Sequence, residues 1–241
     1  MFCSNINAFL FVGVVAFVIV DSQAAYLITV KKTYSCGNDE FQHEEGSSRK
    51  WEKKEITYFI ESFGTSMSAE DVRKGIKSAF SHWADTVDLT FEEVYESDAD
   101  IVFGFKSGEH DDNFTFNNGY FAENVKMAHC VGKMPCTAIH FDDDLYWRFV
   151  DGGGKWLDYR RVGEVLDFQT VAMHQIGHAL GLEHIGDDGT RHAYADEESV
   201  NIMDKIYTRP AGIFKGYVWP RPHTGDVRAI KALYPKVEDF E

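Results

Sequence analysis

The sequence has no excess of positive charge. Its 24 lysine and arginine residues are outnumbered by 39 aspartate and glutamate residues, which gives a formal net charge of −15. A strongly acidic chain repels the phosphate backbones of DNA and RNA, so nucleic acid is not an expected partner. The acidic residues serve either divalent cations or solubility, and composition does not distinguish the two.

The chain also lacks a membrane-spanning run after residue 20. The apolar run from Ala8 to Val20 is itself too short to span a bilayer. It is followed by "DSQAA", in which Ser22 and Ala24 are small residues at signal-peptidase spacing. We therefore expect a signal peptide over residues 1–24 and a secreted, extracellular product. No basic residue precedes the run, so a short signal anchor is the alternative.

Internal repeats, an interdomain linker and a phosphate-binding loop are missing as well. The "DGGGK" stretch at 151–155 lacks the strand and Lys-Ser/Thr pair of a phosphate loop. A length of 241 residues with 44% apolar content suits one domain of roughly 200 residues. Residues 25–50 are polar and are expected to form a poorly ordered lead.

Cysteine is scarce: four are present, and Cys3 falls in the expected signal peptide. Cys130 and Cys136 are close enough in sequence to close a small disulfide loop in an oxidising compartment. Cys36 is then left over. It is a free thiol, an intermolecular partner or a metal ligand.

Hydrophobic periodicity predicts mixed secondary structure. Alternation predicts strands at 53–60, 89–94, 98–105 and 137–144. Helical spacing predicts helices within 66–87, from about Asp167 to Leu180, and over 225–234, the first with Ser68 and Asp71 as a capping pair. The stretch 106–136 is expected to be a long loop, and long loops in compact domains are usually functional.

Three histidines stand out in "HQIGHALGLEH", residues 174–184. His174 and His178 are four apart on the expected helix and project from one face. Gly181 ends the helix and lets His184 return as a third nitrogen ligand. Three protein ligands and one open position are typical of catalytic zinc. Histidines without a metal are the alternative.

This stretch resembles the metzincin zinc signature His-Glu-x-x-His-x-x-Gly-x-x-His, and the chain resembles the matrixin family in particular. The segments "LTFEEV", "DADIVFGFKSGEH", "IHFDDD" and "IKALYP" resemble matrixin segments in the same order, from Trp51 to Pro235. The resemblance implies an α+β fold with a twisted, mostly parallel five-stranded sheet and three helices. The catalytic cleft would lie between a large N-terminal and a small C-terminal subdomain of a domain at 51–235, followed by a tail at 236–241.

The resemblance also implies a methionine turn below the zinc. Met203 in "NIMDKIY" matches that methionine, and Tyr207 matches the aromatic residue of the substrate-pocket wall. Lys205 stands where the family usually has proline. Residues 185–200 lengthen the gap between His184 and Met203 and indicate an inserted loop.

A second, structural zinc site is implied by the same resemblance. The family uses three histidines and one aspartate, and His110, Asp112, His129 and His140 match them. Four protein ligands without an open position are typical of structural zinc. Polar loop histidines are the alternative, because the interval from 110 to 129 is longer than the family norm.

Calcium is a further implication. Asp142 and Asp100 resemble family calcium ligands. Leu145 and Asn117 replace expected acidic residues, and the loss of charged oxygen ligands lowers calcium affinity. The carboxylates are otherwise ordinary solvated groups.

Cys36 lies in "YSCGNDE", which resembles the family's cysteine switch, Pro-Arg-Cys-Gly-x-Pro-Asp, whose thiolate caps the catalytic zinc. The Cys-Gly pair is kept, but Tyr34 and Ser35 replace the proline and arginine. The stretch from Ala25 to Cys36 is also too short for a helical propeptide.

Gln175 occupies the position of the family's general base, a glutamate. An amide cannot accept a proton at neutral pH, and loss of a general acid–base typically costs about 10²–10⁴ in rate. We therefore expect a zinc-binding, peptidase-like protein with impaired hydrolysis that binds an extended peptide or extracellular matrix protein.

Two alternatives stay open beside this expectation. The first is an active metalloendopeptidase with a substitute base. Glu197 or Glu198 of the inserted loop could reach the cleft, whereas the side chain of Glu183 is expected to diverge from that of His184. The second is a non-catalytic structural or peptide-binding module. The sequence does not indicate the oligomeric state.

Overall fold

The computed structural model describes residues 18–21, 24–27, 32–38, 48–118, 122–150, 165–185, 201–208 and 217–235. The expected tail at 236–241, the insertion from 186 to 200 and most of the expected signal peptide lie outside these ranges.

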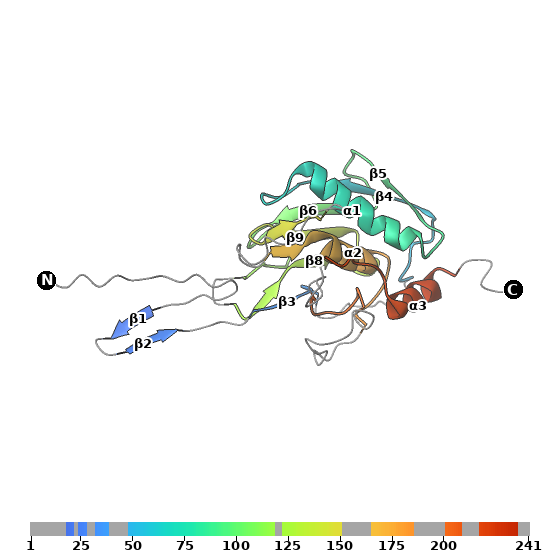
Figure 1. Ribbon diagram of the computed structural model, residues 1–241. Helices are drawn as coiled ribbons and strands as arrows, with labels where there is room; N and C mark the ends of the chain where they lie inside the picture. Colours follow the sequence, from blue (N-terminus) through green and yellow to red (C-terminus); the bar gives the residue numbers. More distant parts are fainter. Residues whose placement is uncertain are drawn as a thin grey trace.

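Five strands form the central sheet in the spatial order β5-β4-β6-β9-β8 (Figure 1). They are β4 (Glu55–Ile60), β5 (Thr90–Glu93), β6 (Ile101–Lys106), β8 (Ala128–Val131) and β9 (Ala138–Asp142). The first four strands in this order are parallel to one another, and β8 pairs antiparallel with β9. The expected α+β fold with a mostly parallel five-stranded sheet is confirmed.

The prediction of one long loop over 106–136 is wrong. Part of this stretch forms β7 (Asn124–Lys126) and β8, and β8 places His129 opposite His140 of β9. Strands this short contain too few alternating residues to be recognised. They form through pairing with distant chain in the folded state: β8 with β9, and β7 with β3.

The N-terminal lead is the second correction. Residues 25–50 are expected to be poorly ordered, yet β3 (Thr33–Ser35) pairs in parallel with β7 and buries Ser35. Its partner lies about 90 residues away, so local sequence cannot indicate the pairing. Nearby, β1 (Val18–Asp21) and β2 (Ala24–Leu27) pair antiparallel with each other.

Helix α1 (Ala69–Ala84) forms as its capping pair predicts. The Ser68 side chain accepts a hydrogen bond from the backbone N–H of Asp71. The buried face of the helix consists of Val72, Gly75, Ile76, Ala79, Phe80 and Trp83. The indole of Trp83 donates to the carbonyl of Met173 at 3.0 Å, which fixes α1 against the helix that carries the histidines.

Helix α2 (Phe168–Ala179) is buried on nearly all sides, including its polar residues Gln169, His174, Gln175 and His178. Its N-cap Asp167 accepts from the backbone N–H of Thr170 at 2.8 Å. It ends before Gly181, whose φ of +95° suits glycine. A Cβ there would also collide with the carbonyl of Arg49. The chain can therefore turn sharply towards His184.

Both ends of the domain hold the C-terminal end of α2. The Tyr234 hydroxyl donates to the carbonyl of Leu180 and accepts from the backbone N–H of Trp51, both at 3.0 Å. The Trp51 indole donates to the carbonyl of Ala179 at 2.7 Å. Tyr234 follows α3 (Thr224–Leu233), the third helix of the described ranges.

The remaining strands, β10 (Tyr146–Arg148) and β11 (Val165–Asp167), pair in parallel and lead into α2. None of the helices in the described ranges combines the length and apolar character needed to cross a bilayer.

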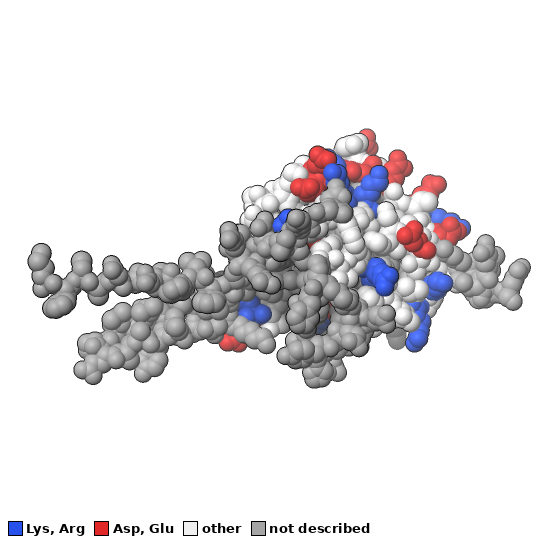
Figure 2. All heavy atoms as spheres, in the orientation of Figure 1, with Lys and Arg blue, Asp and Glu red and all other residues white. Residues whose placement is uncertain are grey.

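Acidic side chains gather on the surface near α1 and β5 (Figure 2). Several of them pair with basic neighbours, including Glu93 with Arg73 at 2.8 Å and Asp88 with Lys54. Exposed pairs of this kind contribute little to stability.

Candidate metal centre

Helix α2 presents His174 and His178 on one face, one turn apart. His174 Nδ1 lies 2.7 Å from the carbonyl oxygen of Ile202, and His178 Nδ1 lies 2.7 Å from that of Leu182. A carbonyl oxygen only accepts hydrogen bonds, so each Nδ1 carries the ring proton. Each Nε2 is therefore left with a bare lone pair.

The two Nε2 atoms lie 2.9 Å apart. Two neutral rings that are both protonated at Nδ1 cannot donate to one another, so their lone pairs face each other. A cation between them removes that repulsion, and carbonyl oxygens that accept from Nδ1 in this way orient metal-binding histidines. On tetrahedral zinc, nitrogens about 2.0–2.1 Å from the metal are roughly 3.3 Å apart, close to the observed separation.

His184 and Cys36 complete the group. The His184 ring centroid lies 5.2 Å from that of His174 and 4.7 Å from that of His178, and Cys36 Sγ lies 3.7 Å from His178 Nε2. The ligand atoms of the four residues all lie within 4.8 Å of one another. Three imidazoles and one thiol form a donor set suited to zinc.

Burial keeps the imidazoles in the form that binds metal. It lowers the pKa of His174 to about 4 and holds the pKa of His178 well below its ordinary value. Without a metal, burial raises the pKa of the Cys36 thiol to about 11, while Asn38, Gln175, Lys126 and Lys205 act in the opposite direction. A coordinating thiol is deprotonated outright, so a bound cation would reverse the balance.

Cys36 arrives on an extended piece of chain, residues 33–38, which we call the Cys36 segment. On one side it follows β7 and β8: the backbone N–H of Met127 donates to Ser35 and that of Gly37 donates to Ala128, at 3.0 and 2.8 Å. The side chain of Asn38 then exchanges two hydrogen bonds with the backbone of Cys130, at 2.9 and 2.7 Å.

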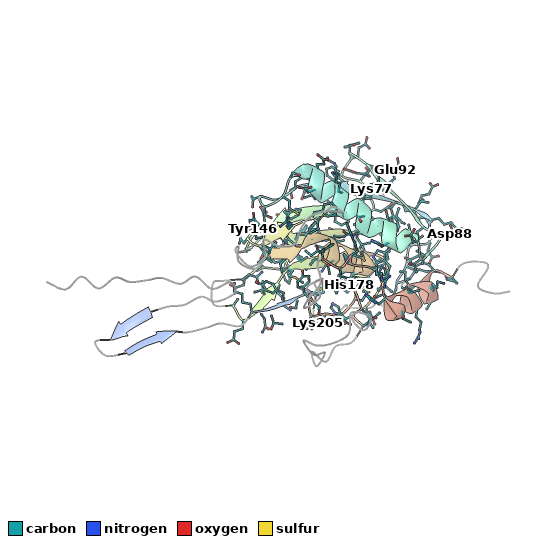
Figure 3. The ribbon with its side chains drawn as sticks, in the orientation of Figure 1. Lys77, Asp88, Glu92, Tyr146, His178 and Lys205 are labelled. Carbon is teal, nitrogen blue, oxygen red and sulfur yellow. A yellow bond between two sulfur atoms is a disulfide. The ribbon has the colours of Figure 1, made fainter. Side chains whose placement is uncertain are left out.

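On the other side the Cys36 segment follows residues 205–207. The backbone N–H of Cys36 donates to Lys205 at 3.0 Å, and that of Tyr207 donates to Tyr34 at 2.8 Å. Figure 3 labels Lys205 and His178, two of the residues that contact Cys36. The Cys36 segment therefore lies as an extended strand between β7 and β8 on one side and residues 205–207 on the other.

Gly37 allows this close fit. A Cβ at this residue would meet His129 Cβ and the Phe114 ring at 2.8 Å and the Ala128 carbonyl oxygen at 2.9 Å. The Cys-Gly pair thus has a steric reason: any side chain at residue 37 forces the segment away from β8.

Gln175 is fully buried beside the group. Its Nε2 lies 3.3 Å from Cys36 Sγ and 3.3 Å from the Ala128 carbonyl oxygen, while its Oε1 has no hydrogen-bond partner among the described residues. The group contains no carboxylate within the part of the chain that the structure describes.

Among the described residues, Glu183 does not supply a carboxylate there. Glu183 forms an ion pair with Arg49 at 2.9 Å, and both side chains are about half exposed, at 48% and 45%. Glu197 and Glu198 lie outside the described residues.

Met203 is buried beneath α2, and its sulfur packs on Gly177. Asp226 fixes this turn by accepting from the backbone N–H groups of Ile202, Met203 and His223 at 2.8, 3.0 and 2.8 Å. Ile202 in turn orients His174. Asp226 is not among the residues that the sequence predicts for the site, because its place near the start of α3 indicates a helix cap but not its link to residues 202 and 203.

A second group lies on the outer strands and the loop after β6. Asp112 lies 2.9 Å from His140 Nδ1 and 3.3 Å from the Nε2 atoms of His110 and His129. Phe114 stacks on His129 with ring centroids 4.1 Å apart. Burial lowers the pKa of His129 to about 4 and also lowers that of His140, which favours neutral, metal-binding rings.

The two carboxylates associated with calcium have protein partners. Asp100 accepts from the backbone and side chain of Thr57 and pairs with Lys53 at 2.6 Å. Asp142 accepts from the side-chain amide of Asn118 at 2.5 Å. Neither belongs to a potential metal group of three or more within the described ranges.

The predicted disulfide and the predicted pocket residue, Tyr207, are both within the described residues. Cys130 and Cys136 form a disulfide with Cα atoms 5.9 Å apart. The hydroxyl of Tyr207 accepts from the backbone N–H of Asp167 at 3.0 Å, which links the wall of residues 205–207 to the start of α2.

Comparison with known proteins agrees with this geometry. The matrixin family model matches residues 50–235. Matrix metalloproteinase-C of Caenorhabditis elegans is 34% identical over 194 residues, covering 78% of this chain and 29% of that protein. Interstitial collagenase of Sus scrofa is 34% identical over 170 residues, covering 68% of this chain and 33% of that protein.

The chain thus spans about a third of the length of these curated relatives. The family model, however, covers most of the chain and both histidine groups. This protein belongs to the matrixin family of metalloproteinases.

Proposed function

We propose that this chain is a secreted, zinc-binding matrixin in which peptide hydrolysis is strongly impaired. The observation that carries the proposal is that the zinc ligands are all present, whereas the general base of the family is replaced by an amide. His174, His178 and His184 converge, and the residue beside them is Gln175.

Zinc at this centre would polarise a peptide carbonyl and lower the pKa of a bound water towards about 7. Gln175 can donate hydrogen bonds there but cannot take up a proton. Loss of a general acid–base typically lowers the rate by about 10²–10⁴. One residue would serve two proton transfers here, so the upper part of that range applies.

The Cys36 segment supports a role in binding extended peptides. It adds along β7 and β8 through backbone hydrogen bonds, which is the mode of β-strand addition. A partner peptide would use the same edge after the segment leaves. Because interstitial collagenases are among the relatives, an extracellular matrix protein is the proposed partner.

Secretion is supported by the apolar run at 8–20 followed by small residues. The disulfide between Cys130 and Cys136 also fits an oxidising compartment.

The second group, His110, Asp112, His129 and His140, is proposed to hold a structural zinc that ties the loop after β6 to β8 and β9. Calcium is not part of the proposal, because Asp100 and Asp142 already accept hydrogen bonds from protein donors.

Peptide hydrolysis by variants of Gln175 tests the proposal. The background carries Cys36→Ala and Gly37→Ala, which removes the thiol and the space that the Cys36 segment needs. Zinc-loaded protein with Gln175→Glu in this background is expected to hydrolyse a generic peptide at least about 100-fold faster than the background alone.

Equal and rapid hydrolysis by both proteins would overturn the loss of the base. Equal and undetectable hydrolysis would show that more than the base has been lost. Zinc content measured on the same samples shows whether both proteins carry the metal.

A further inference from the structure

We propose that Gln175 is a positioning residue that holds Cys36 on the metal, so that the resting centre has four protein ligands. The inference rests on the proposed zinc site and assigns Gln175 a role beyond the absence of a base.

Gln175 Nε2 is placed to donate to sulfur. It lies 3.3 Å from Cys36 Sγ, and the Ala128 carbonyl oxygen, also at 3.3 Å, fixes the orientation of the amide because it accepts the other N–H. A metal-bound sulfur is a thiolate that has lost its proton to solvent and only accepts hydrogen bonds. The observed amide orientation therefore suits the thiolate.

A glutamate at residue 175 would reverse both contacts. An ionised carboxylate has no N–H to give to the sulfur or to the Ala128 carbonyl. It would also place a second negative charge beside the thiolate in a fully buried site, where like charges repel strongly. Glutamine thus favours the capped centre over one with a glutamate.

The surroundings of Cys36 point the same way. Lys126 Nζ donates to the Cys36 carbonyl oxygen at 3.1 Å, and the Lys205 carbonyl accepts from the Cys36 backbone N–H at 3.0 Å. The side chain of Asn38, two residues further on, is hydrogen-bonded to the backbone of Cys130. These bonds restrain the Cys36 segment, and with it the sulfur, from sliding along β8.

The consequence is a closed centre. Three imidazoles and a thiolate fill the four positions of tetrahedral zinc, which is the arrangement of structural rather than catalytic sites. In the resting protein the wall of β7 and β8 would then be occupied by the chain's own Cys36 segment, and access for a partner would require its release.

Cobalt substitution and alkylation of Cys36 test this role. The full chain is loaded with Co²⁺, the thiolate-to-cobalt charge-transfer absorption is recorded, and alkylation by iodoacetamide at Cys36 is followed by peptide mass mapping. The variants are Gln175→Glu and Gln175→Leu, the second of which removes the donor without adding charge.

Gln169→Glu is the matched control. Gln169 lies on the same helix, is equally buried and donates to Ser78 Oγ at 2.7 Å, away from the histidines. The Gln169→Glu variant places the same buried glutamate in the same helix, at a residue that does not contact Cys36.

The wild-type protein and Gln169→Glu are expected to show the charge-transfer band and slow alkylation. Both Gln175 variants should lose intensity in the band and be alkylated roughly ten- to a hundredfold faster, the range for loss of a hydrogen bond to a charged group. Gln175 variants that keep the wild-type band and alkylation rate would overturn the inference.

The outcome is separable from the proposed function because no substrate is used. Cobalt that binds with ligand-field bands but no thiolate band would sink the inference and leave the histidine site standing. A wild-type chain that binds no cobalt at all would overturn both.

Discussion

Asp167 shows how a single buried carboxyl shapes the response to pH. It caps α2 and also accepts from the hydroxyls of Thr170 and Tyr217, at 2.7 and 2.9 Å. Burial nevertheless raises the pKa of Asp167 to about 6. The folded state therefore holds this proton more tightly than the unfolded chain does.

Replacement of Asp167 by asparagine tests this effect. The contribution of Asp167 is fully present below about pH 4 and is lost as the pH rises through about 6, by on the order of 2–3 kcal/mol. Asparagine caps helices equally well and carries no charge. The stability difference, Asp167→Asn minus wild type, should therefore grow between pH 4 and 7 in denaturant titrations.

A stability difference that is constant over this pH range would show that folding does not raise the pKa of Asp167. Asp88→Asn is a suitable control, because Asp88 lies on the surface in an exposed ion pair.

The Cys36 segment sets the behaviour at the scale of an element. Its place depends on a glycine whose missing side chain leaves room for His129 and Phe114. Gly37→Ala should expel the segment while the sheet and the three helices stay folded. Alkylation of Cys36 in the native protein is then expected to accelerate at least about tenfold, with unchanged circular dichroism.

If Gly37→Ala left the alkylation rate of Cys36 as slow as in the wild type, the position of the segment would not depend on the missing side chain at residue 37. Asn38→Ala gives a graded comparison, because it removes two hydrogen bonds to Cys130 without adding bulk.

The elements also show what sequence can predict. Strands β4, β5, β6 and β9 and the three helices carry their own periodicity and caps, such as Ser68 and Asp71. Strands β3, β7 and β8 are three or four residues long and exist through pairing with distant chain. Local pattern contains no such information.

The residues of the two histidine groups also divide into those that local sequence indicates and those that only the fold brings together. The spacing of His174, His178 and His184 is encoded within eleven residues, and helix geometry brings the first two together. The contacts of Gln175 with Cys36 and of Asp226 with the methionine turn span 139 and 23 residues, so only the fold reveals them.

At the scale of the whole molecule, the two proposed metal sites would tie the chain together. One joins α2 to the Cys36 segment, and the other joins the loop after β6 to β8 and β9. Ligands that bind only the folded state stabilise it by mass action. Removal of metal by a chelator should therefore lower the melting temperature, and added zinc should restore it.

Chelation that left the melting temperature unchanged would mean that the metals, if bound, do not hold the fold. A calcium-selective chelator provides the comparison, and it is expected to have little effect because Asp100 and Asp142 have protein partners.

The most direct test of a metal centre retained without its base is the zinc content of the full chain. Native mass spectrometry of the wild type is expected to show two zinc ions, with one lost in His178→Ala and the other lost in His129→Ala. A wild-type chain that binds no zinc, or a His178→Ala variant that binds as many zinc ions as the wild type, would contradict the retained centre.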